Sequence, residues 1–322
     1  ANITTDNGDL TLIANDLTSN GVVNAQRDDG LAVITLGSGT TINTGTGTFT
    51  STIEAGTGKT YSGSGDITLS TITANSLVAA NSGYTTGDIL DTGVLTIAGT
   101  SSFTTSFSNA DITLDSENVF TGAVTLNTTG SSGNATVDNG TTALDIAASS
   151  VGGNLTLTSG NASGITDSGT VTVGGDLAAT TDANSGAIDL GTLAVTGSVA
   201  LNTHSGGAAI VVNATTLDFE ASTVRGTLNA TATAGDITDS GVLAITGAST
   251  FTVANGRSIT LSESSTYSST VTFASGGTIA SVEINDSDAF DLKTLTTTGN
   301  LTVTAGDDIT DSGTVTVGGN LI

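Results

Sequence analysis

The feature that most limits how this chain can fold is an internal repeat. The string ITDSG occurs three times, beginning at Ile165, Ile237 and Ile309, and the copies are equally spaced, about 72 residues apart. A looser copy begins at Ile89, at a slightly longer spacing before Ile165. The flanks repeat as well, since ITDSGTVTVGGDL at Ile165 returns as ITDSGTVTVGGNL at Ile309. Repetition at a fixed period is typical of solenoids, in which each unit packs only on its neighbours.

A shorter period lies inside the long one. Leu155, Leu177 and Val199 are equally spaced, about 22 residues apart, and each opens a short alternation of apolar and polar residues. Alternation of this kind is typical of strands with one buried face. No helical periodicity is sustained, and the 43 glycines disfavour helix. A coil of this size cannot bury its own apolar side chains, so successive coils must stack.

We therefore predict an all-β fold, a right-handed parallel β-helix that forms one continuous solenoid over residues 1–322. At about 23 residues per coil the chain makes roughly 14 coils of about 22–27 residues, three to each 72-residue module. Residues 1–64 are divergent coils, and residues 65–322 carry the modular repeats. We expect six apolar residues to point inward and the Thr residues beside them to face water. The inward residues are Leu155, Leu157, Val171, Val173, Leu301 and Val303.

The string GDITDSG at Gly235 predicts a corner of the coil. We expect Asp239 to accept a hydrogen bond from the backbone N–H two residues later, in an Asx turn. Gly235 and Gly241 would supply backbone conformations that other residues resist, left-handed at Gly241. Three coils separate successive copies by about 14 Å, so Asp167, Asp239 and Asp311 are not expected to form one metal site.

Charge and composition exclude several classes of function. The net charge is −25, from 30 acids and 5 bases. It argues against nucleic-acid binding, which needs a basic face, and against docking on anionic lipid. No stretch approaches 18 uninterrupted apolar residues, so we predict no transmembrane helix. The absence of Pro suits a chain built of ladder hydrogen bonds, and the absence of Cys and Met suits an exposed, extracellular life.

Residues able to support catalysis are few and scattered. The bases include Lys59, Arg225, Arg257 and Lys293, and the one histidine is His204, which we expect in a solvated turn. One His and no Cys leave no metal-ligand cluster and no His-based triad. We predict no catalytic residue, no cofactor-binding residue and no metal ligand, and therefore no enzyme.

Calcium binding is the alternative that the acidic residues raise. Oxygen-rich stretches occur at Asn285–Asp288, Asp307–Asp308 and Asp28–Asp29. The chain has no EF-hand loop and no GGxGxD array, the arrangements that supply the six to eight oxygens calcium prefers. We interpret these acids as surface charge that keeps a β-rich chain soluble, with no cofactor and weak calcium binding as the alternative.

Three other features have plain structural explanations. TxT strings such as TGTGTFT at Thr44–Thr50 raise an ice-binding solenoid as a remote alternative, but Thr is also a good strand former for a wet face. The aromatic residues are expected to fill the core or corners, and the sequons to be incidental products of the repeat. The aromatic residues are Phe103, Phe120, Tyr267 and Phe273, and the sequons begin at Asn154, Asn229 and Asn300.

The repeats resemble those of a known class of bacterial surface protein. DITLDSENVFTGAVTL at Asp111–Leu126, ASSVGGNLTLTSG at Ala148–Gly160 and GNLTVTAGDDITDSGTVTVGGNL at Gly299–Leu321 are similar to filamentous-haemagglutinin-like repeats. The resemblance covers most of the chain from about Gly65 onward. It implies a right-handed β-helix and a giant surface adhesin exported by two-partner secretion. The NPNG-type secretion domain of that family is missing here.

The function expected from this resemblance is structural. We expect a non-catalytic extracellular rod at the bacterial cell surface, either the shaft of a giant adhesin or the repeat unit of a filament or sheath, and a segment of a longer repeat protein. Its partners would be further copies of the same surface protein, joined end-to-end or laterally, with an unidentified receptor. A calcium- or glycan-binding matrix protein is the alternative, and a polysaccharide-active β-helix enzyme is a remote one.

Overall fold

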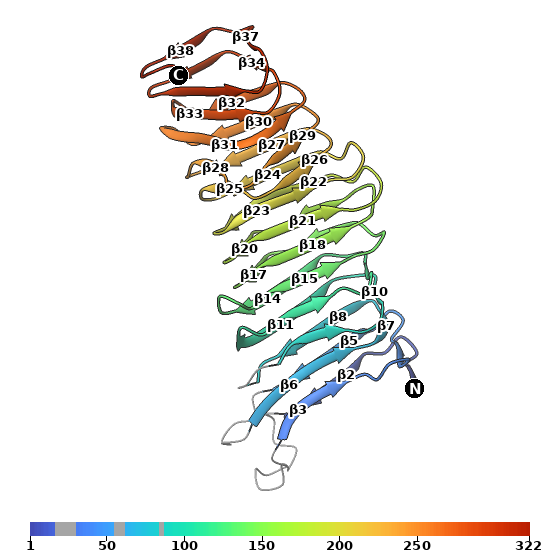
Figure 1. The fold of residues 1–322 in the computed structure, drawn as a ribbon. Helices are drawn as coiled ribbons and strands as arrows, with labels where there is room; N and C mark the ends of the chain where they lie inside the picture. Colours follow the sequence, from blue (N-terminus) through green and yellow to red (C-terminus); the bar gives the residue numbers. More distant parts are fainter. Residues whose placement is uncertain (17–29, 55–61, 84–86) are drawn as a thin grey trace. The chain divides into compact units, whose positions relative to one another are not determined.

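The computed structural model describes residues 1–16, 30–54, 62–83 and 87–322. These residues form two compact units, Ala1–Ser159 (unit 1) and Gly160–Ile322 (unit 2). Every regular element in the described ranges is a β-strand, and neighbouring strands pair in parallel (Figure 1). The predicted all-β parallel solenoid is confirmed, while its right-handed sense stays a prediction.

Unit 1 winds its strands into three parallel ladders. The first ladder comprises β1 (Asn2–Thr4), β4 (Thr41–Asn43), β7 (Thr71–Ala74), β10 (Leu95–Ile97) and β13 (Val119–Phe120). The second comprises β2 (Leu10–Ala14), β5 (Thr48–Ile53), β8 (Ser76–Asn81), β11 (Ser101–Ser108), β14 (Val124–Thr129) and β16 (Leu144–Ile146), with β17 (Ser149–Val151) beside β14. The third comprises β3 (Gly30–Thr35), β6 (Ser62–Leu69), β9 (Ile89–Asp91), β12 (Ile112–Leu114), β15 (Ala135–Asp138) and β18 (Leu155–Ser159).

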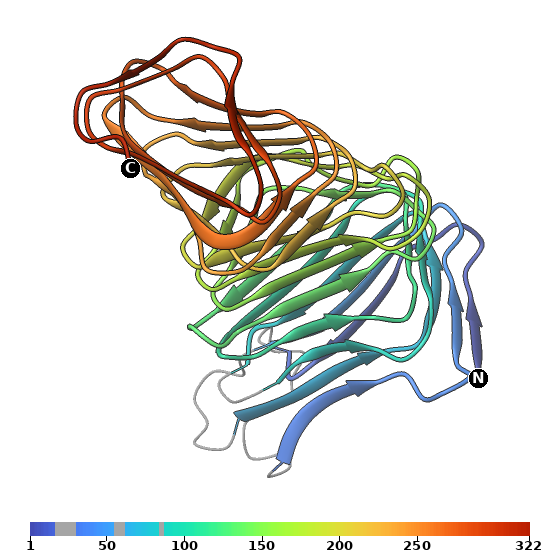
Figure 2. The ribbon, with the colours of Figure 1, turned by 45° about the horizontal axis from the view of Figure 1, so that its top comes forward.

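Unit 2 is built mainly from two ladders, and the winding of its coils is clearest in Figure 2. One comprises β19 (Ile165–Asp167), β22 (Ile188–Val195), β24 (Ala209–Asn213), β27 (Leu228–Ala232), β30 (Ser249–Val253) and β32 (Val271–Ser275), with β20 (Val171–Val173) beside β22. The other comprises β21 (Leu177–Thr181), β23 (Ser198–Asn202), β25 (Leu217–Phe219), β26 (Ser222–Val224), β28 (Ile237–Asp239), β29 (Leu243–Ile245), β31 (Arg257–Tyr267), β33 (Ile279–Asp286), β35 (Leu295–Thr297), β36 (Leu301–Ala305) and β38 (Val315–Val317). A separate pair comprises β34 (Phe290–Leu292) and β37 (Ile309–Asp311).

Some of the coils are shorter than predicted. The longest step from residue 65 onward is the pairing of Leu77 with Ser101, and the shortest is that of Ile279 with Thr297. The first step lies within the predicted range of coil length, and the second lies below it. The reason is tight corners, because only three or four residues separate consecutive strands from β27 to β30. The first steps are longer, since Leu10 pairs with Phe49 and Phe49 with Leu77.

The phase of the coils also differs from the prediction. The ladders that begin at β2 in unit 1 and at β19 in unit 2 each have six strands, and the pair of β34 and β37 follows them. The repeat module is longer than three coils. Successive pairings lead from Ile165 through Ile188 and Ala209 to Leu228, which lies three coils further on. Ile237 comes after Leu228 in the sequence and lies in the other ladder. The first two copies of ITDSG therefore lie on different ladders.

The core is a column of inward side chains, as the alternation predicts. Val303 is the exception and is only half-buried, because it lies on β36, where little of the chain packs over it. The predicted outward Thr also has an exception: Thr44 is buried, and its hydroxyl donates to the Gly47 carbonyl at 3.0 Å. The other predicted inward residues are all buried, namely Leu155, Leu157, Val171, Val173 and Leu301.

Aromatic rings pack against one another in the core. Phe103 and Phe120 meet edge to face at 5.8 Å between ring centroids, and Phe251 lies 6.1 Å from Tyr267 in the same arrangement. All four rings are buried, which confirms that Phe103, Phe120 and Tyr267 are fillers, while Phe273 is half-buried. In the described ranges we find no helix long and apolar enough to cross a membrane.

Candidate functional site: side-chain links between coils

The Asp of the ITDSG corners at Ile165 and Ile237 binds the neighbouring coil. Asp239 Oδ1 accepts the N–H of Ser262 at 2.8 Å. Asp167 Oδ1 accepts the N–H of Gly191 at 2.9 Å, and its Oδ2 accepts the N–H and the hydroxyl of Thr192, both at 2.8 Å. The predicted Asx turn is therefore wrong. A parallel coil brings the backbone of the next rung within about 4.8 Å, which puts that backbone within reach of the carboxylate.

The corner glycines are needed for close packing and not for a left-handed backbone. Gly241 and Gly235 do not have positive φ, which corrects the expectation for Gly241. A Cβ on Gly241 would overlap the backbone of Ala221, and one on Gly235 would overlap that of Thr216. Left-handed φ occurs at Gly164, just before the ITDSG at Ile165, with φ of 73°.

A column of acids and amides links the coils of unit 1. The side chains of Asp66, Asp88, Asp111 and Asn134 each accept the backbone N–H of the next member, ending at Asn154, at 2.8–3.0 Å. Burial raises the pKa of Asp88, and the backbone N–H of Asp111 opposes that shift. These carboxylates are engaged with the backbone of the neighbouring coil rather than converging on a common point.

Buried asparagines make a stronger link, because an amide both accepts and donates. Asn213 Oδ1 accepts the N–H of Val195 at 2.8 Å, and its Nδ2 donates to the Val195 carbonyl at 3.0 Å and to the Thr216 carbonyl at 2.7 Å. In unit 1, Asn139 makes the same two-way contact with the backbone of Phe120. Both amides are fully buried.

One such position holds a carboxylate instead. Asp286 and Tyr267 stand one module after Asn213 and Val195, respectively. Asp286 is 1% exposed, and its Oδ1 accepts the N–H of Tyr267 at 3.3 Å and that of Asp288 at 3.2 Å. Burial is the largest cause that raises the pKa of Asp286, and the charge of Asp288 adds to it.

The strand ladder is interrupted where this substitution occurs. In the repeat that contains Asn213, which we call the first copy, β23 pairs with β25 and β26. We call this pairing of strands the Asn213 joint. In the second copy, the corresponding β32 pairs with β30 alone, while β34 pairs with β37. We call the gap between β32 and β34 the Asp286 joint. Consistent with this gap, Phe273 on β32 is half-buried, whereas Leu201 on β23 is fully buried.

A small cavity occupies the Asp286 joint. Its volume is about 210 Å³. That is below the range of about 300–1,000 Å³ typical of sites for drug-sized ligands. The cavity is lined by Tyr267, Ser268, Ser269, Thr270, Val271, Asp286, Ala289, Phe290, Asp291 and Lys293.

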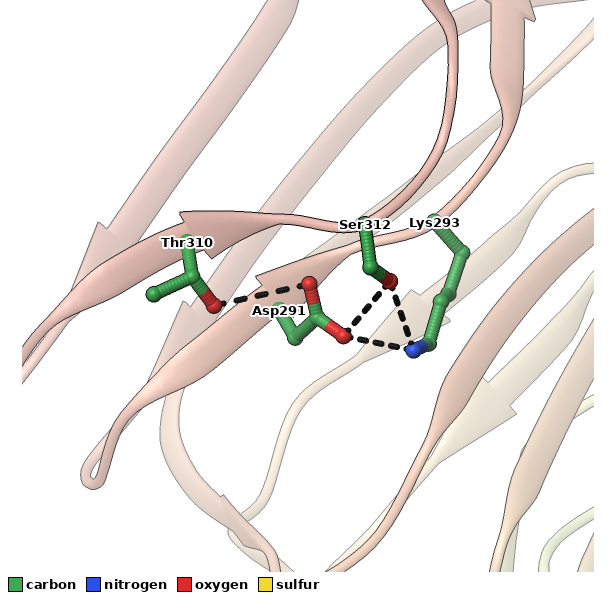
Figure 3. Close-up of polar contacts among 4 residues, drawn as sticks. All are labelled: Asp291, Lys293, Thr310 and Ser312. Atoms are coloured by element: carbon green, nitrogen blue, oxygen red, sulfur yellow. Dashed lines mark hydrogen bonds and ion pairs between the residues drawn. The ribbon is translucent and has the colours of Figure 1, made fainter.

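A polar cluster lies beside this cavity (Figure 3). Asp291 accepts hydrogen bonds from Ser312 at 2.8 Å and Thr310 at 3.4 Å, and Lys293 Nζ lies 2.5 Å from Asp291 Oδ2. The hydrogen bond from Lys293 is the largest cause that lowers the pKa of Asp291. Lys293 is the cation of the one ion pair found among the described residues.

The first copy has the same network without the cation. Asp218, which corresponds to Asp291, accepts hydrogen bonds from Thr238 and Ser240, both at 2.7 Å. Glu220 stands where the second copy has Lys293. The cluster in Figure 3 is therefore a repeated inter-coil link to which one lysine has been added.

The other residues singled out in the sequence do not converge. His204 is exposed, and its Nδ1 lies 2.9 Å from the Asn184 carbonyl oxygen. Arg225 directly follows β26, Arg257 begins β31, and both are exposed. Lys59 and the Asp28–Asp29 pair lie outside the described residues.

The described acidic stretches and sequons do not come together, and Asp286 of the stretch Asn285–Asp288 is buried, which corrects the interpretation of that stretch as surface charge. Among the residues that the structure describes, no three His, Cys, Asp or Glu side chains are grouped so that they could hold a metal ion. Asp307 and Asp308 are exposed, as is Asp311 of the third ITDSG. The sequon residues Asn154, Asn229 and Asn300 are also exposed.

Sequence reasoning missed the two joints, although a signal was present. Aligning residues 210–219 with 283–292 places Asn213 opposite Asp286 and Thr215 opposite Asp288. The signal is a polar residue at the last inward position of an alternating strand. In β24 the inward position after Val211 is taken by Asn213.

Comparison with known proteins agrees with the repeat structure. No curated protein and no solved structure matches the chain. The profile of one family matches residues 56–127, 132–202, 206–274 and 279–321, under the description "Repeats of unknown function (DUF5649)". These four matches cover most of the sequence, and the length of the first three agrees with the repeat module. The chain therefore belongs to the DUF5649 family of repeats.

Proposed function

We propose that the chain is a non-catalytic structural segment of a bacterial surface protein, either an adhesin shaft or the repeating unit of a filament or sheath. The observation that carries this proposal is the use made of its polar side chains. Carboxylates and amides that could face a substrate instead accept backbone N–H groups of the neighbouring coil, as in the column from Asp66 to Asn154.

These links suit a part whose task is to span a distance. Each hydrogen bond contributes a net free energy of about 1 kcal/mol, and bonds of the same kind recur at several coils. The stability of a stack of this kind grows with the number of coils, since each coil contacts only its neighbours. Length can therefore change by whole repeats without redesign of a central core.

An extracellular location is supported by composition and by resemblance. The chain has no Cys and no Met, so it offers little to oxidation. Its net charge of −25 keeps a surface of strands soluble. The resemblance to filamentous-haemagglutinin-like repeats points to the same place. In this proposal the partners are further copies of the surface protein, which meet through strand edges or coil faces.

The test is cryo-electron microscopy of native surface material, with the chain traced coil by coil. Coils continuing beyond this segment on an isolated fibre would identify a shaft, and regular lateral contacts between copies would identify a filament or sheath. A compact, capped particle that cleaves a polysaccharide would overturn the proposal.

A further inference from the structure

The Asn213 joint shows how one amide positions a strand. Asn213 ends β24, and its Nδ2 holds the Thr216 carbonyl, just before β25 begins. The same amide pairs both ways with Val195, which ends β22 shortly before β23. The turn that leads into β25 is thus tied to the residue that precedes β23. As a consequence, β25 arrives beside β23, where Val199 pairs with Phe219.

The Asp286 joint lacks the donors that make this tie. In the first copy the Val195 carbonyl accepts from the Asn213 amide at 3.0 Å and from the Thr215 hydroxyl at 3.1 Å. The second copy has Asp286 and Asp288 at these two positions. An ionised carboxylate only accepts hydrogen bonds, so neither side chain can donate to the Tyr267 carbonyl.

The loss is confined to the donated bonds. Asp286 still accepts the N–H of Tyr267, as Asn213 accepts that of Val195. The backbone bond that enters the turn also remains, because the N–H of Ser287 donates to the Ser265 carbonyl at 2.6 Å. The ladder between β32 and β34 is absent beyond this point, and the cavity lies there.

We propose that Asp286 is a protonation-dependent link between the coils of β32 and β34. Ionised, it leaves β34 apart from β32. When its free oxygen takes a proton from solvent, the carboxyl group gains the donor that Asn213 has. Its O–H then donates to the carbonyl of Tyr267 or Ala289, while Oδ1 keeps the N–H of Tyr267, and β34 closes onto β32. Apart from this O–H bond, no covalent bond forms or breaks.

The charged groups around Asp286 favour uptake of the proton. Asp288 lies in the same turn and repels a second negative charge. Its carbonyl accepts the N–H of Asp307, which brings a further acid near the turn. Lys293 faces the same cavity, but Asp291 already holds its charge.

Tyr267 is the other titratable group in contact with Asp286, and it stays neutral. Burial is the largest cause that raises the pKa of its phenol, with the charge of Asp239 adding to it. Burial likewise raises the pKa of Asp286 above the ordinary carboxyl value. The folded state therefore holds the proton more tightly than the unfolded chain. The joint is expected to close as the pH falls through that raised pKa.

The experiment measures hydrogen-exchange protection of the backbone in the full chain at pH 3.5 and 7.5, corrected for intrinsic exchange. In the wild type, residues 271–275 and 290–292 are expected to be about five- to tenfold better protected at pH 3.5, the factor that one net hydrogen bond supplies. Asp286→Asn is expected to give the higher protection at both pH values.

Two further variants keep the test specific. Asn213→Asp should create a pH-dependent loss of protection at β23 and β25, where the wild type has none. Asp291→Asn removes an exposed carboxylate from the same cavity and should leave the pH dependence of β32 unchanged. Equal wild-type protection at the two pH values, or an unaltered pH dependence in Asp286→Asn, would overturn the proposal even if Asn213→Asp failed to fold.

Discussion

The two joints of unit 2 have nearly the same sequence pattern and different structures. At the Asn213 joint, Phe219 is fully buried beneath a continuous ladder. At the Asp286 joint, the corresponding Leu292 is half-buried, and β34 pairs with β37 alone. Apolar alternation is present in both copies. The comparison teaches that alternation places side chains inward, whereas a buried donor decides whether adjacent coils close.

The largest expected effect comes from truncating the core residue of each joint. Phe219→Ala should lower the free energy of unfolding by about 3–5 kcal/mol, because it empties a buried aromatic site. Leu292→Ala should cost clearly less, since that side chain is already half-buried. Chemical denaturation of the two variants makes the measurement. Equal losses would contradict the difference between the joints.

The next effect comes from making the Asn213 joint resemble the Asp286 joint. Asn213→Asp at pH 7.5 should destabilise the fold by about 3 kcal/mol, because it buries a charge and removes the donated bonds. The loss should shrink as the pH falls, because the buried carboxyl group then takes up a proton. Asn229→Asp is the matched control, since Asn229 is exposed and should change stability little. An equal loss in both variants would remove the special role of Asn213.

Substitution of one corner glycine near each joint tests whether the Asp286 joint can shift to make room for an added Cβ. A Cβ at Gly241 would overlap the backbone of Ala221, and one at Gly313 would overlap that of Thr294. Gly241→Ala should cost about 1–3 kcal/mol through overpacking.

Gly313→Ala should cost less than Gly241→Ala, because β34, which lies just before Thr294, can shift into the cavity of the Asp286 joint. Gly276→Ala, where the added Cβ meets nothing within 4 Å, is the control. Thermal unfolding ranks the three variants. The looseness of the Asp286 joint would be disproved by a Gly313 variant that loses as much as the Gly241 variant.

Asp239 lies between the two joints in the sequence and should make the stability of the whole fold depend on pH. Burial, opposed by the N–H groups of Ser262 and Glu263, raises the pKa of Asp239 to about 6. Because the folded state binds the proton more tightly, the free energy of unfolding should rise as pH falls from 7 to about 4, and level off below that. Asp239→Asn should flatten part of this slope in denaturation curves. An unchanged slope would mean that other acids cause it.

The smallest effect concerns Lys293. Lys293→Ala should raise the pKa of Asp291 toward its ordinary value, since the hydrogen bond from Lys293 is what chiefly lowers it. Thermal stability should hardly change, because exposed ion pairs contribute little. Carbon-detected NMR titration of Asp291 reads the shift. If the Asp291 pKa stayed low, the hydroxyl of Ser312 would be the dominant partner.

Much of the fold could be predicted from particular residues. Leu155, Val171 and their neighbours indicated the inward column, and the string at Ile165 indicated the repeat. The length of a coil was overestimated, because distances between similar residues do not reveal how few residues a corner needs. The roles of Asp239 and Gly241 were misplaced for a related reason. The sequence shows only the possible partners within the same turn, whereas the actual partners of Asp239 and Gly241 lie one coil away.

The sequence by itself determined the parallel solenoid, since alternation and a long period leave stacked coils as the way to bury the apolar side chains. It also determined which residue types recur at corners. Only the tertiary structure decided which backbone groups these side chains meet, and that Asp286 stands where Asn213 pairs both ways. The physical reason is that hydrogen-bond partners a full coil apart are set by the register of stacking, which depends on contacts that no single repeat contains.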